Sequence, residues 1–358
     1  MRRGTAMKDG QEIDRTLDQL KARLPRINLA FLPTPLHKLP ALSRQYGVEL
    51  YMKRDDLTGI EFGGNKTRKL EFVLPDVLAA GGDYVITGAS VQSNWCRQTV
   101  SACTRCGLKT VLYLFGRDPG EYRGNLLLDK ALGAEVHLIR LMEGESLYDG
   151  LARTEEMRKQ RMQELEQEGH KGVYLKVGAP FPKGHAAYVW AMAELVHQLR
   201  DFGMTLDDLD YIVTPIGAGG TYTGLLVGKK LFESKVEIHG YCTSGMHPTM
   251  EEDILNASRA TAECLELDLS FDKEDINVSF DYGGEYDIPT AKSTEAIKRV
   301  ARNEGLLLDP VYTAKAMSGL LDHLEDGSIS RGSRVLFWHT GGLPALFSGQ
   351  ETAGAIHE

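Results

Sequence analysis

The sequence predicts an α/β protein with a two-lobed, three-layer α/β/α arrangement built on sheets of mainly parallel strands. Two observations lead to this fold class. Short apolar runs typical of buried strands alternate with longer segments of helical spacing, an order that favours parallel sheets wound by helices. In addition, 358 residues are more than one small hydrophobic core usually holds, which favours two lobes.

The first part of the chain carries the pattern of one lobe. We expect strands at 48–53, 84–87, 110–115 and 136–141, and helices at 66–80, 92–106 and 125–132. The charged stretch 146–170 is expected to form one long helix with a solvated face, and to end this lobe.

The second part of the chain repeats the alternation. We expect helices at 184–200, 222–232, 292–304 and 313–324, and strands at 211–215, 236–241 and 334–338. No linker is rich enough in proline or serine to separate independent domains, so the lobes should share an interface. The expected division is residues 1–50 as the first part of a large domain, 51–170 as a small α/β domain, and 171–358 as the remainder of the large domain.

Composition excludes several classes of protein. The 41 basic and 50 acidic residues give a formal net charge of −9, which disfavours a nucleic-acid-binding surface. No apolar run approaches the ~18 residues of a membrane span, and no secretory apolar segment follows the N-terminal arginines. We therefore expect a cytoplasmic protein. We expect the first ten or so residues to be loose.

The sequence offers no clear metal or disulfide framework. The five cysteines cannot all pair within one chain, and Cys103 and Cys106 form a CxxC in the middle of a predicted helix. We interpret them as reduced structural cysteines, with regulatory redox chemistry as the alternative. Asp55 and Asp56 adjoin Lys53 and Arg54 without further ligands at suitable spacing, so they are interpreted as a turn with local ion pairs.

A glycine pair leads into a helix start that carries lysines. Gly63 and Gly64 precede Lys66, and Lys69 lies one turn later on the same helix face. A lysine at such a turn can be buried in a cleft, which lowers its pKa and makes it a competent amine for Schiff-base chemistry. One of the two lysines could form a Schiff base while the other contacts a phosphate. A surface helix with ordinary lysines is the alternative.

A second glycine-rich loop lies between a predicted strand and a predicted helix. Backbone N–H groups in such a loop, together with the helix N-terminus, form a cradle for an anion. The dinucleotide fingerprint fails because Tyr222 replaces its last glycine, which favours a single phosphate. A tight turn without a ligand is the alternative. The loop consists of Gly217, Ala218, Gly219, Gly220 and Thr221.

Two further groups of residues could carry chemistry. Ser93, Asn94 and Trp95 stand at a helix start, where they could cap the helix or present N–H groups to a carboxylate. Tyr286 and Tyr312 could each hand a proton to a leaving group, although a buried tyrosine is more often a packing residue.

Taken in order, these motifs resemble those of the D-cysteine desulfhydrase and 1-aminocyclopropane-1-carboxylate deaminase family. That family belongs to the tryptophan-synthase-β-like, fold type II enzymes that use pyridoxal 5'-phosphate. The resemblance runs from about residue 30 to residue 348 and is carried by LPTPLHKLPALS, YMKRDDLTG, FGGNKTRKLEF, VQSNWCRQT, PIGAGGT, GEYDIP, LDPVYTAKAM and HTGGLPALF.

The resemblance implies roles toward the cofactor. Lys66 would form the Schiff base and act as the base at the substrate α-carbon. Lys69 and the loop 217–221 would hold the phosphate, Asn94 would bond to the pyridoxal 3-hydroxyl, and Thr313 would meet the pyridine nitrogen. The large domain would bind the cofactor, and the protein would form a homodimer.

The resemblance also implies roles toward the substrate. Ser93, Asn94 and the backbone at Trp95 would receive the substrate carboxylate, while Tyr286 and Tyr312 would line the reacting face.

Three departures from the family pattern bear on the substrate. The deaminases carry Glu at the position of Thr313, and a threonine there would leave the pyridine nitrogen largely neutral. The desulfhydrases usually have His at the position of Trp95, so a bulky indole should reshape the pocket. The segment 178–182 differs from the Gly-Gly-Ser type run of relatives.

We therefore expect α,β-elimination from a small β-substituted amino acid, with D-cysteine converted to pyruvate, sulfide and ammonia as the first expectation. L-cysteate sulfo-lyase and 1-aminocyclopropane-1-carboxylate deaminase activities are the alternatives within the enzyme class. A non-catalytic phosphate- or nucleotide-binding protein, whose Lys66 never forms an imine, is the alternative from another class.

Overall fold

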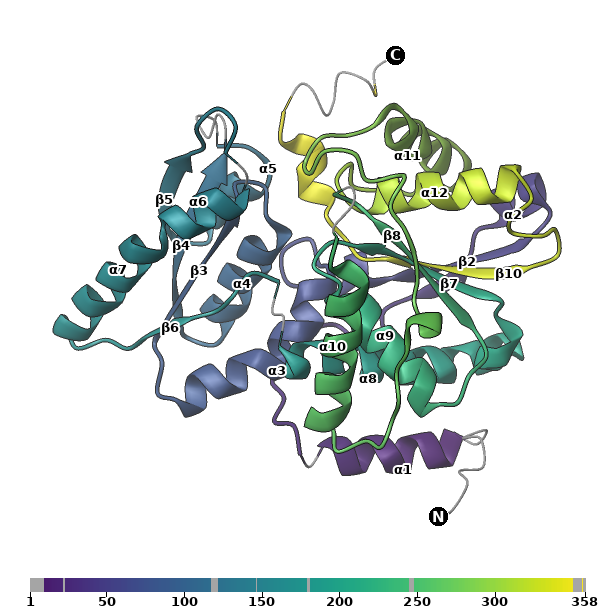
Figure 1. Cartoon of the computed structure of the whole chain (residues 1–358), viewed down its shortest axis with the longest axis horizontal. Helices are drawn as coiled ribbons and strands as arrows, with labels where there is room; N and C mark the ends of the chain where they lie inside the picture. Colours follow the sequence, from purple (N-terminus) through teal and green to yellow (C-terminus); the bar gives the residue numbers. More distant parts are fainter. Residues whose placement is uncertain are drawn as a thin grey trace.

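The structure, a computed structural model, describes residues 10–21, 23–116, 122–145, 147–178, 181–244, 248–349 and 356. Its larger sheet has the strand order β1-β2-β10-β7-β8-β9, and only β1 runs antiparallel to its neighbour. Figure 1 shows this sheet on the right. The strands are β1 (Leu36–Lys38), β2 (Glu49–Arg54), β7 (Tyr211–Ile216), β8 (Glu237–Cys242), β9 (Asn277–Ser279) and β10 (Arg334–His339).

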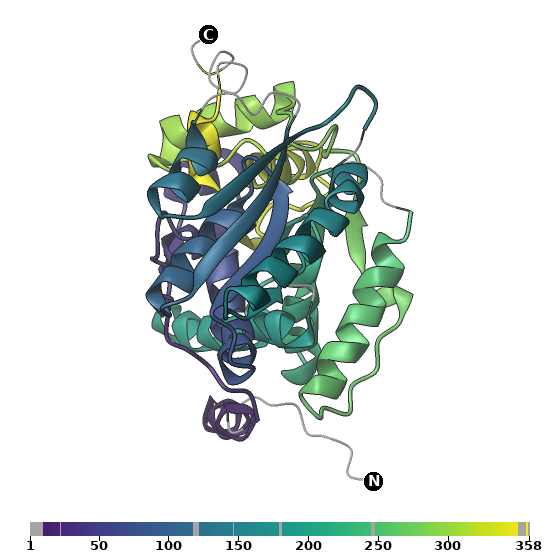
Figure 2. The same cartoon turned by 90° about the vertical axis from the view of Figure 1, so that its left-hand side faces the viewer.

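The smaller sheet is entirely parallel, with the order β5-β4-β3-β6. Figure 2 views the molecule from the side of this sheet, with its strands in front of the larger unit. The strands are β3 (Tyr84–Ser90), β4 (Lys109–Gly116), β5 (Glu135–Arg140) and β6 (Gly172–Tyr174).

Helices cover both faces of each sheet, because separate apolar clusters fill the two sides. On the larger sheet one side holds α1 (Gly10–Lys21), α8 (Pro182–Leu199), α9 (Gly220–Leu231) and α10 (Met250–Cys264), and the other holds α2 (Pro40–Tyr46), α11 (Ala291–Glu304) and α12 (Thr313–Glu325). On the smaller sheet one side holds α3 (Asn65–Ala79), α4 (Asn94–Arg105) and α5 (Gly124–Ala131), and the other holds α6 (Leu147–Arg153) and α7 (Glu155–Gln167).

The predicted fold class is confirmed, and most predicted elements lie within a few residues of their expected bounds. The single long helix at 146–170 is wrong. Two helices, α6 and α7, meet at Thr154, whose side chain is buried and whose hydroxyl accepts a hydrogen bond from Arg158. The buried Thr154 at the break is a tertiary feature, and the run of charged residues in the sequence does not record it.

The sheets divide the chain differently from the expected domain bounds. β2 crosses residue 51 and joins the larger sheet, while β6 extends the smaller sheet past residue 170. The helix α10 was not predicted, nor were α1 and α2. The residues expected to be loose, 1–9, lie outside the described part of the chain.

Two of the composition arguments can be followed in the structure. Within the described ranges, no helix has both the length and the apolar character that crossing a membrane requires. Cys103 and Cys106 are free thiols, and burial raises the pKa of Cys103 to about 12. A thiol with that pKa keeps its proton at neutral pH, as the structural interpretation requires.

Candidate active site

A cavity lies where the helices of the two sheets meet, with about 740 Å³ of empty space counted out to its mouth. It is lined by short segments that follow strands of both sheets. The lining residues are Asn65, Lys66, Lys69, Ala89, Ser93, Asn94, Trp95, Val177, Gly178, Pro215, Gly217, Ala218, Gly219, Gly220, Thr221, Tyr286, Tyr312, Thr340 and Gly341.

The start of α3 is hydrogen-bonded to a segment beside each of the two sheets. The N–H of Asn65 donates to the Thr340 carbonyl at the end of β10 (2.9 Å), and the N–H of Thr67 donates to the side chain of Gln98 on α4 (2.9 Å). These bonds satisfy N–H groups that a helix start leaves without intrahelical acceptors. Thr340 follows a strand of the larger sheet, and α4 packs on the smaller sheet, so the helix turn that carries the lysines is fixed between the two.

Burial tunes the two lysines of this turn. It lowers the pKa of Lys66 to about 8, against the opposing pull of the Asp309 carboxylate. The Lys66 Nζ donates to Asn65 Oδ1 (3.0 Å). Burial and the neighbouring charge of Lys66 hold the pKa of Lys69 well below its ordinary value. Near neutral pH, Lys66 therefore has the unprotonated amine fraction that a nucleophile or base requires.

The glycine loop forms an anion cradle of the expected kind. Gly219 has a left-handed backbone (φ 75°), and α9 begins directly after it, so the first N–H groups of α9 point out of the helix toward the cavity. A Cβ on Gly220 would lie 2.8 Å from the Lys69 Nζ, and only glycine leaves that space open. Asn65 Nδ2 donates to Thr221 Oγ1 (3.0 Å) and ties the lysine turn to the cradle. The residues present fit a phosphate group.

The predicted carboxylate receptor stands at the start of α4. Ser93 is the N-cap, and its hydroxyl accepts from the Cys96 N–H (3.2 Å). Asn94 Oδ1 accepts from Asn125 Nδ2 (3.0 Å), which leaves the Asn94 NH₂ group as the donor for a ligand. The capping interpretation is confirmed for Ser93, and the carboxylate-binding interpretation stays a prediction.

Trp95 lines the cavity, but its indole belongs to the apolar core of the smaller sheet. Its Nε1 donates to Thr87 Oγ1 (2.8 Å), and the residue is only 2% exposed. The indole is thus fixed against β3, which limits how far it can reshape the pocket. Part of the segment 178–182, also expected to matter for the pocket, lies outside the described residues.

The two predicted tyrosines meet at the cavity. Their hydroxyl oxygens, on Tyr286 and Tyr312, are 2.7 Å apart, and the rings lie edge to face. Burial raises the pKa of Tyr286 to about 12 and that of Tyr312 further above its ordinary value. Both phenols therefore carry their protons at neutral pH, and one can donate while the other accepts.

Thr313 is the one predicted site residue that does not line the cavity. It is fully buried at the start of α12, and its hydroxyl donates to Asp309 Oδ1 (2.6 Å). The same Oγ1 accepts from the Asp309 N–H (2.8 Å). Its predicted contact with the cofactor ring stays a prediction.

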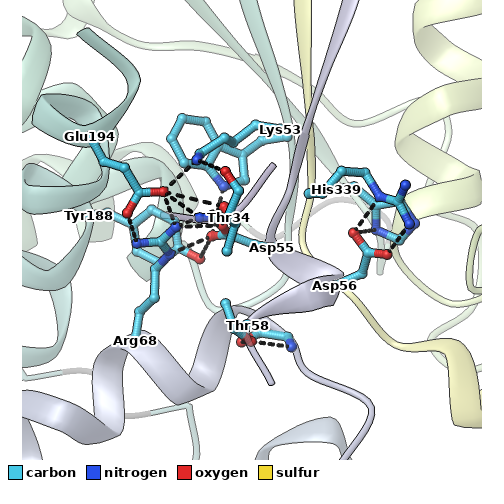
Figure 3. Close-up of polar contacts among 12 residues, drawn as sticks. Thr34, Lys53, Asp55, Asp56, Thr58, Arg68, Tyr188, Glu194 and His339 are labelled. Carbon is cyan, nitrogen blue, oxygen red and sulfur yellow. Dashed lines mark hydrogen bonds and ion pairs between the residues drawn. The ribbon is translucent and has the colours of Figure 1, made fainter. Parts of the chain in front are cut away.

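A buried ion cluster lies beside the lysine turn (Figure 3). Arg68 donates to both carboxylate oxygens of Asp55 (3.0 and 2.8 Å) and to both of Glu194 (2.9 and 2.8 Å). Lys53 is ion-paired with Glu194. The interpretation of Asp55 and Asp56 as local ion pairs is wrong for Asp55. Only Asp56 pairs locally, with Arg54 (2.6 Å).

Sequence reasoning missed several residues at the cavity. Asn65, Thr340 and Gly341 line it without having been assigned a role. The available signal was the pair Gly341-Gly342, which follows the strand predicted at 334–338. In the structure a Cβ on Gly341 would lie 2.7 Å from the Cα of Gly64, so the glycine allows a close approach of the two segments. His185, on α8, also reaches this region.

Comparison with known proteins places the chain among well-defined relatives. Residues 27–341 match a family model described as "Pyridoxal-phosphate dependent enzyme". A protein of Pyrococcus abyssi named "Putative 1-aminocyclopropane-1-carboxylate deaminase" is 39% identical over 92% of this chain and 96% of its own. A "1-aminocyclopropane-1-carboxylate deaminase" of Ralstonia nicotianae is 36% identical over 90% of this chain and 95% of its own.

Solved structures agree. The crystal structure of an "ACC deaminase homologue" matches with a TM-score of 0.83 and 34% identity, covering 95% of this chain and 99% of that one. Threonine deaminase isoform 2 from Solanum lycopersicum matches with a TM-score of 0.65 and 18% identity over 99% of this chain and 95% of that one, which supports the fold alone.

Proposed function

Because this chain belongs to the family of pyridoxal-phosphate-dependent enzymes, we propose that it is a lyase that removes the β-substituent of a small amino acid and releases a 2-oxo acid and ammonia. D-Cysteine is the first proposed substrate, with L-cysteate next. Dependence on pyridoxal phosphate and lyase or deaminase chemistry belong to the family. The substrate and the leaving group are what we propose.

One observation supports elimination over ring opening. No Asp or Glu is among the described residues that line the cavity, and the Thr313 hydroxyl donates its hydrogen bond to Asp309. A ring nitrogen without a carboxylate partner is less able to stabilise negative charge. Elimination depends less on this stabilisation than ring opening does, because the negative charge departs with the leaving group.

The chain's own residues have distinct tasks in this proposal. When bound, the cofactor supplies an electron sink for the α-carbon. The Lys66 amine removes the proton at that carbon, and its pKa of about 8 suits it to act as a base near neutral pH. Lys69 and the loop 217–221 hold the phosphate, and Ser93 and Asn94 receive the substrate carboxylate.

The tyrosine pair completes the proposal. Tyr286 and Tyr312 share one short hydrogen bond and carry two protons. One phenol can therefore give a proton to the departing sulfide or sulfite while the other keeps it oriented.

Ring-opening deamination of 1-aminocyclopropane-1-carboxylate is the second candidate. It is favoured by the names of relatives that match 90% or more of this chain at 36–39% identity. The tyrosine pair would then give its proton to a carbon atom instead of a leaving group.

A single screen separates the two candidates. The purified protein, loaded with pyridoxal phosphate, is tested on D- and L-cysteine, L-cysteate, β-chloroalanine and the cyclopropane amino acid for release of 2-oxo acid and ammonia. We expect turnover of at least one β-substituted alanine and little or none of the cyclopropane substrate. Efficient turnover of the cyclopropane amino acid alone would contradict elimination and support the second candidate.

A further inference from the structure

One buried histidine lies beside the anion cradle with an unused nitrogen. His185, in the first turn of α8, is 3% exposed. Its Nε2 is completely enclosed and has no hydrogen-bond partner among the described residues. A buried polar atom without a partner costs free energy unless another group, such as a ligand or a water, satisfies it.

The neighbours of the ring determine where its proton lies. His185 Nδ1 is 3.3 Å from Thr261 Oγ1 on α10. The Thr261 hydroxyl already donates a hydrogen bond to the Ala257 carbonyl (2.7 Å). The Nδ1 must therefore be the donor to Thr261, and Nε2 carries a lone pair. Burial lowers the pKa of His185 to about 3, so the ring is neutral in this environment.

His185 Nε2 and the side-chain nitrogen of Lys69 lie beside the same residue, Gly220. A Cβ on Gly220 would lie 2.8 Å from His185 Nε2 and 2.8 Å from Lys69 Nζ, so both nitrogens border the first residue of α9. In the described part of the chain, no hydrogen bond or ion pair joins Lys69 to a side chain. The side-chain nitrogen of Lys69 thus lies near one free acceptor and near the anion cradle.

We propose that His185 is a positioning residue of the phosphate site: when a phosphate is bound and Lys69 is protonated, Nε2 accepts a hydrogen bond from the Lys69 ammonium and holds it against the first turn of α9. The bond offsets part of the cost of burying that ammonium. It also leaves the remaining N–H donors of Lys69 for the phosphate. The inference concerns the cofactor alone, so it stands or falls independently of the substrate proposed above.

Replacing the imidazole tests the proposal. In His185→Leu the acceptor is gone, and we expect the dissociation constant for pyridoxal phosphate to rise by about tenfold, the effect of one charge-assisted bond. Binding of pyridoxal, which lacks the phosphate, should not change. A general loss of packing would weaken both ligands equally and would overturn the proposal. The ³¹P resonance of the bound cofactor should shift in the same variant.

Two further variants serve as controls. His185→Gln keeps a carbonyl acceptor and should recover part of the affinity. His239→Leu removes another buried histidine, whose Nε2 contacts Ser279 instead of the cradle, and should leave affinity for pyridoxal phosphate unchanged.

A double-mutant cycle with Lys69→Met decides whether His185 acts through Lys69. If it does, His185→Leu has no additional effect on pyridoxal-phosphate affinity once Lys69 is replaced. An undiminished effect in the Lys69→Met background would overturn the proposal, since His185 would then act on the ligand by another route. If His185→Leu does not fold, His185→Ala takes its place in the cycle.

Discussion

Helix α3 carries three basic side chains within four positions. The pKa of one of them is raised, and the pKa values of the other two are lowered. Arg68 is enclosed by the carboxylates of Asp55 and Glu194, which raise its pKa well above the ordinary value. Lys66 and Lys69 are buried without a carboxylate in direct contact, and burial lowers the pKa of both.

The difference teaches which charges hold the fold and which await a ligand. Around Arg68 the charges balance, with Lys53 and Arg68 facing Asp55 and Glu194, and Tyr188 and Trp338 add hydrogen bonds to Asp55 (2.8 and 2.9 Å) (Figure 3). Such a closed group stabilises a structure without binding anything. On the other side of the same helix turn, the two lysines line a cavity with an anion cradle, and no carboxylate of the described residues is in direct contact with them.

The largest effect is expected where the basic side chain has no carboxylate partner. Lys66→Ala should lower turnover by roughly 10³-fold or more, because the position needs an amine both to attach the cofactor and to move a proton. Activity assays and mass spectrometry after borohydride reduction measure both losses. The melting temperature should change little. Substantial elimination by the variant without added amine would show that another lysine carries the chemistry.

The converse substitution acts on stability. Arg68→Met should lower the free energy of unfolding by about 3–5 kcal/mol, because it leaves two buried carboxylates with Lys53 as the one cation of the cluster. Urea unfolding measures this change. Lys159→Met, which breaks an exposed pair with Glu155 on α7, is the matched control and should have no measurable effect. Equal stability of the Arg68 and Lys159 variants would mean that the ion cluster contributes nothing.

The cradle can be probed with a pair of matched substitutions. Gly219→Asp and Gly219→Asn share the same left-handed strain and nearly the same shape, so their difference isolates charge. We expect the Asp variant to bind pyridoxal phosphate at least about tenfold more weakly than the Asn variant, because a carboxylate repels the phosphate. Equal affinities of the two variants, measured by equilibrium dialysis, would reduce the loop to a simple turn.

The smallest effect is a dependence of stability on pH in the cofactor-free protein. The pKa of Lys66 is about 8 in the folded chain, below the ~10.4 of an unfolded lysine. Between these values the unfolded chain binds more protons than the folded one, so the free energy of unfolding should rise with pH. Lys66→Met should make that rise smaller in urea titrations. An identical rise in both proteins would contradict the lowered pKa.

The contrast between the two regions also shows what a sequence can reveal. The lysine turn and the glycine loop are contiguous motifs with glycines at fixed offsets, so each could be identified from local chemistry, and the family resemblance then implied that they meet at one site. The Asp55–Arg68–Glu194 cluster joins residues from the turn after β2, from α3 and from α8, and its pairing depends on tertiary proximity that no local pattern records. For the same reason the sequence predicted a local ion pair for Asp55.

His185 and Thr313 illustrate the remaining limits. A buried histidine in the apolar helix α8 looks like a packing residue, and only its unused Nε2 beside Gly220 distinguishes His185. The contact of Thr313 with the cofactor ring, implied by the resemblance, stays a prediction, and the structure adds that its hydroxyl donates a hydrogen bond to Asp309. Side-chain direction at a helix start depends on such hydrogen bonds, which the sequence does not specify.

The start of α3 has a further consequence, for the cooperativity of unfolding. Its N–H groups bond to Thr340 after β10 and to Gln98 on α4, so this one turn connects the two sheets. A ligand in the cavity contacts segments from both sheets as well, and it binds only when both are folded. Bound cofactor should therefore merge the unfolding of the two sheets into a single transition, and its removal should allow the smaller sheet to unfold first.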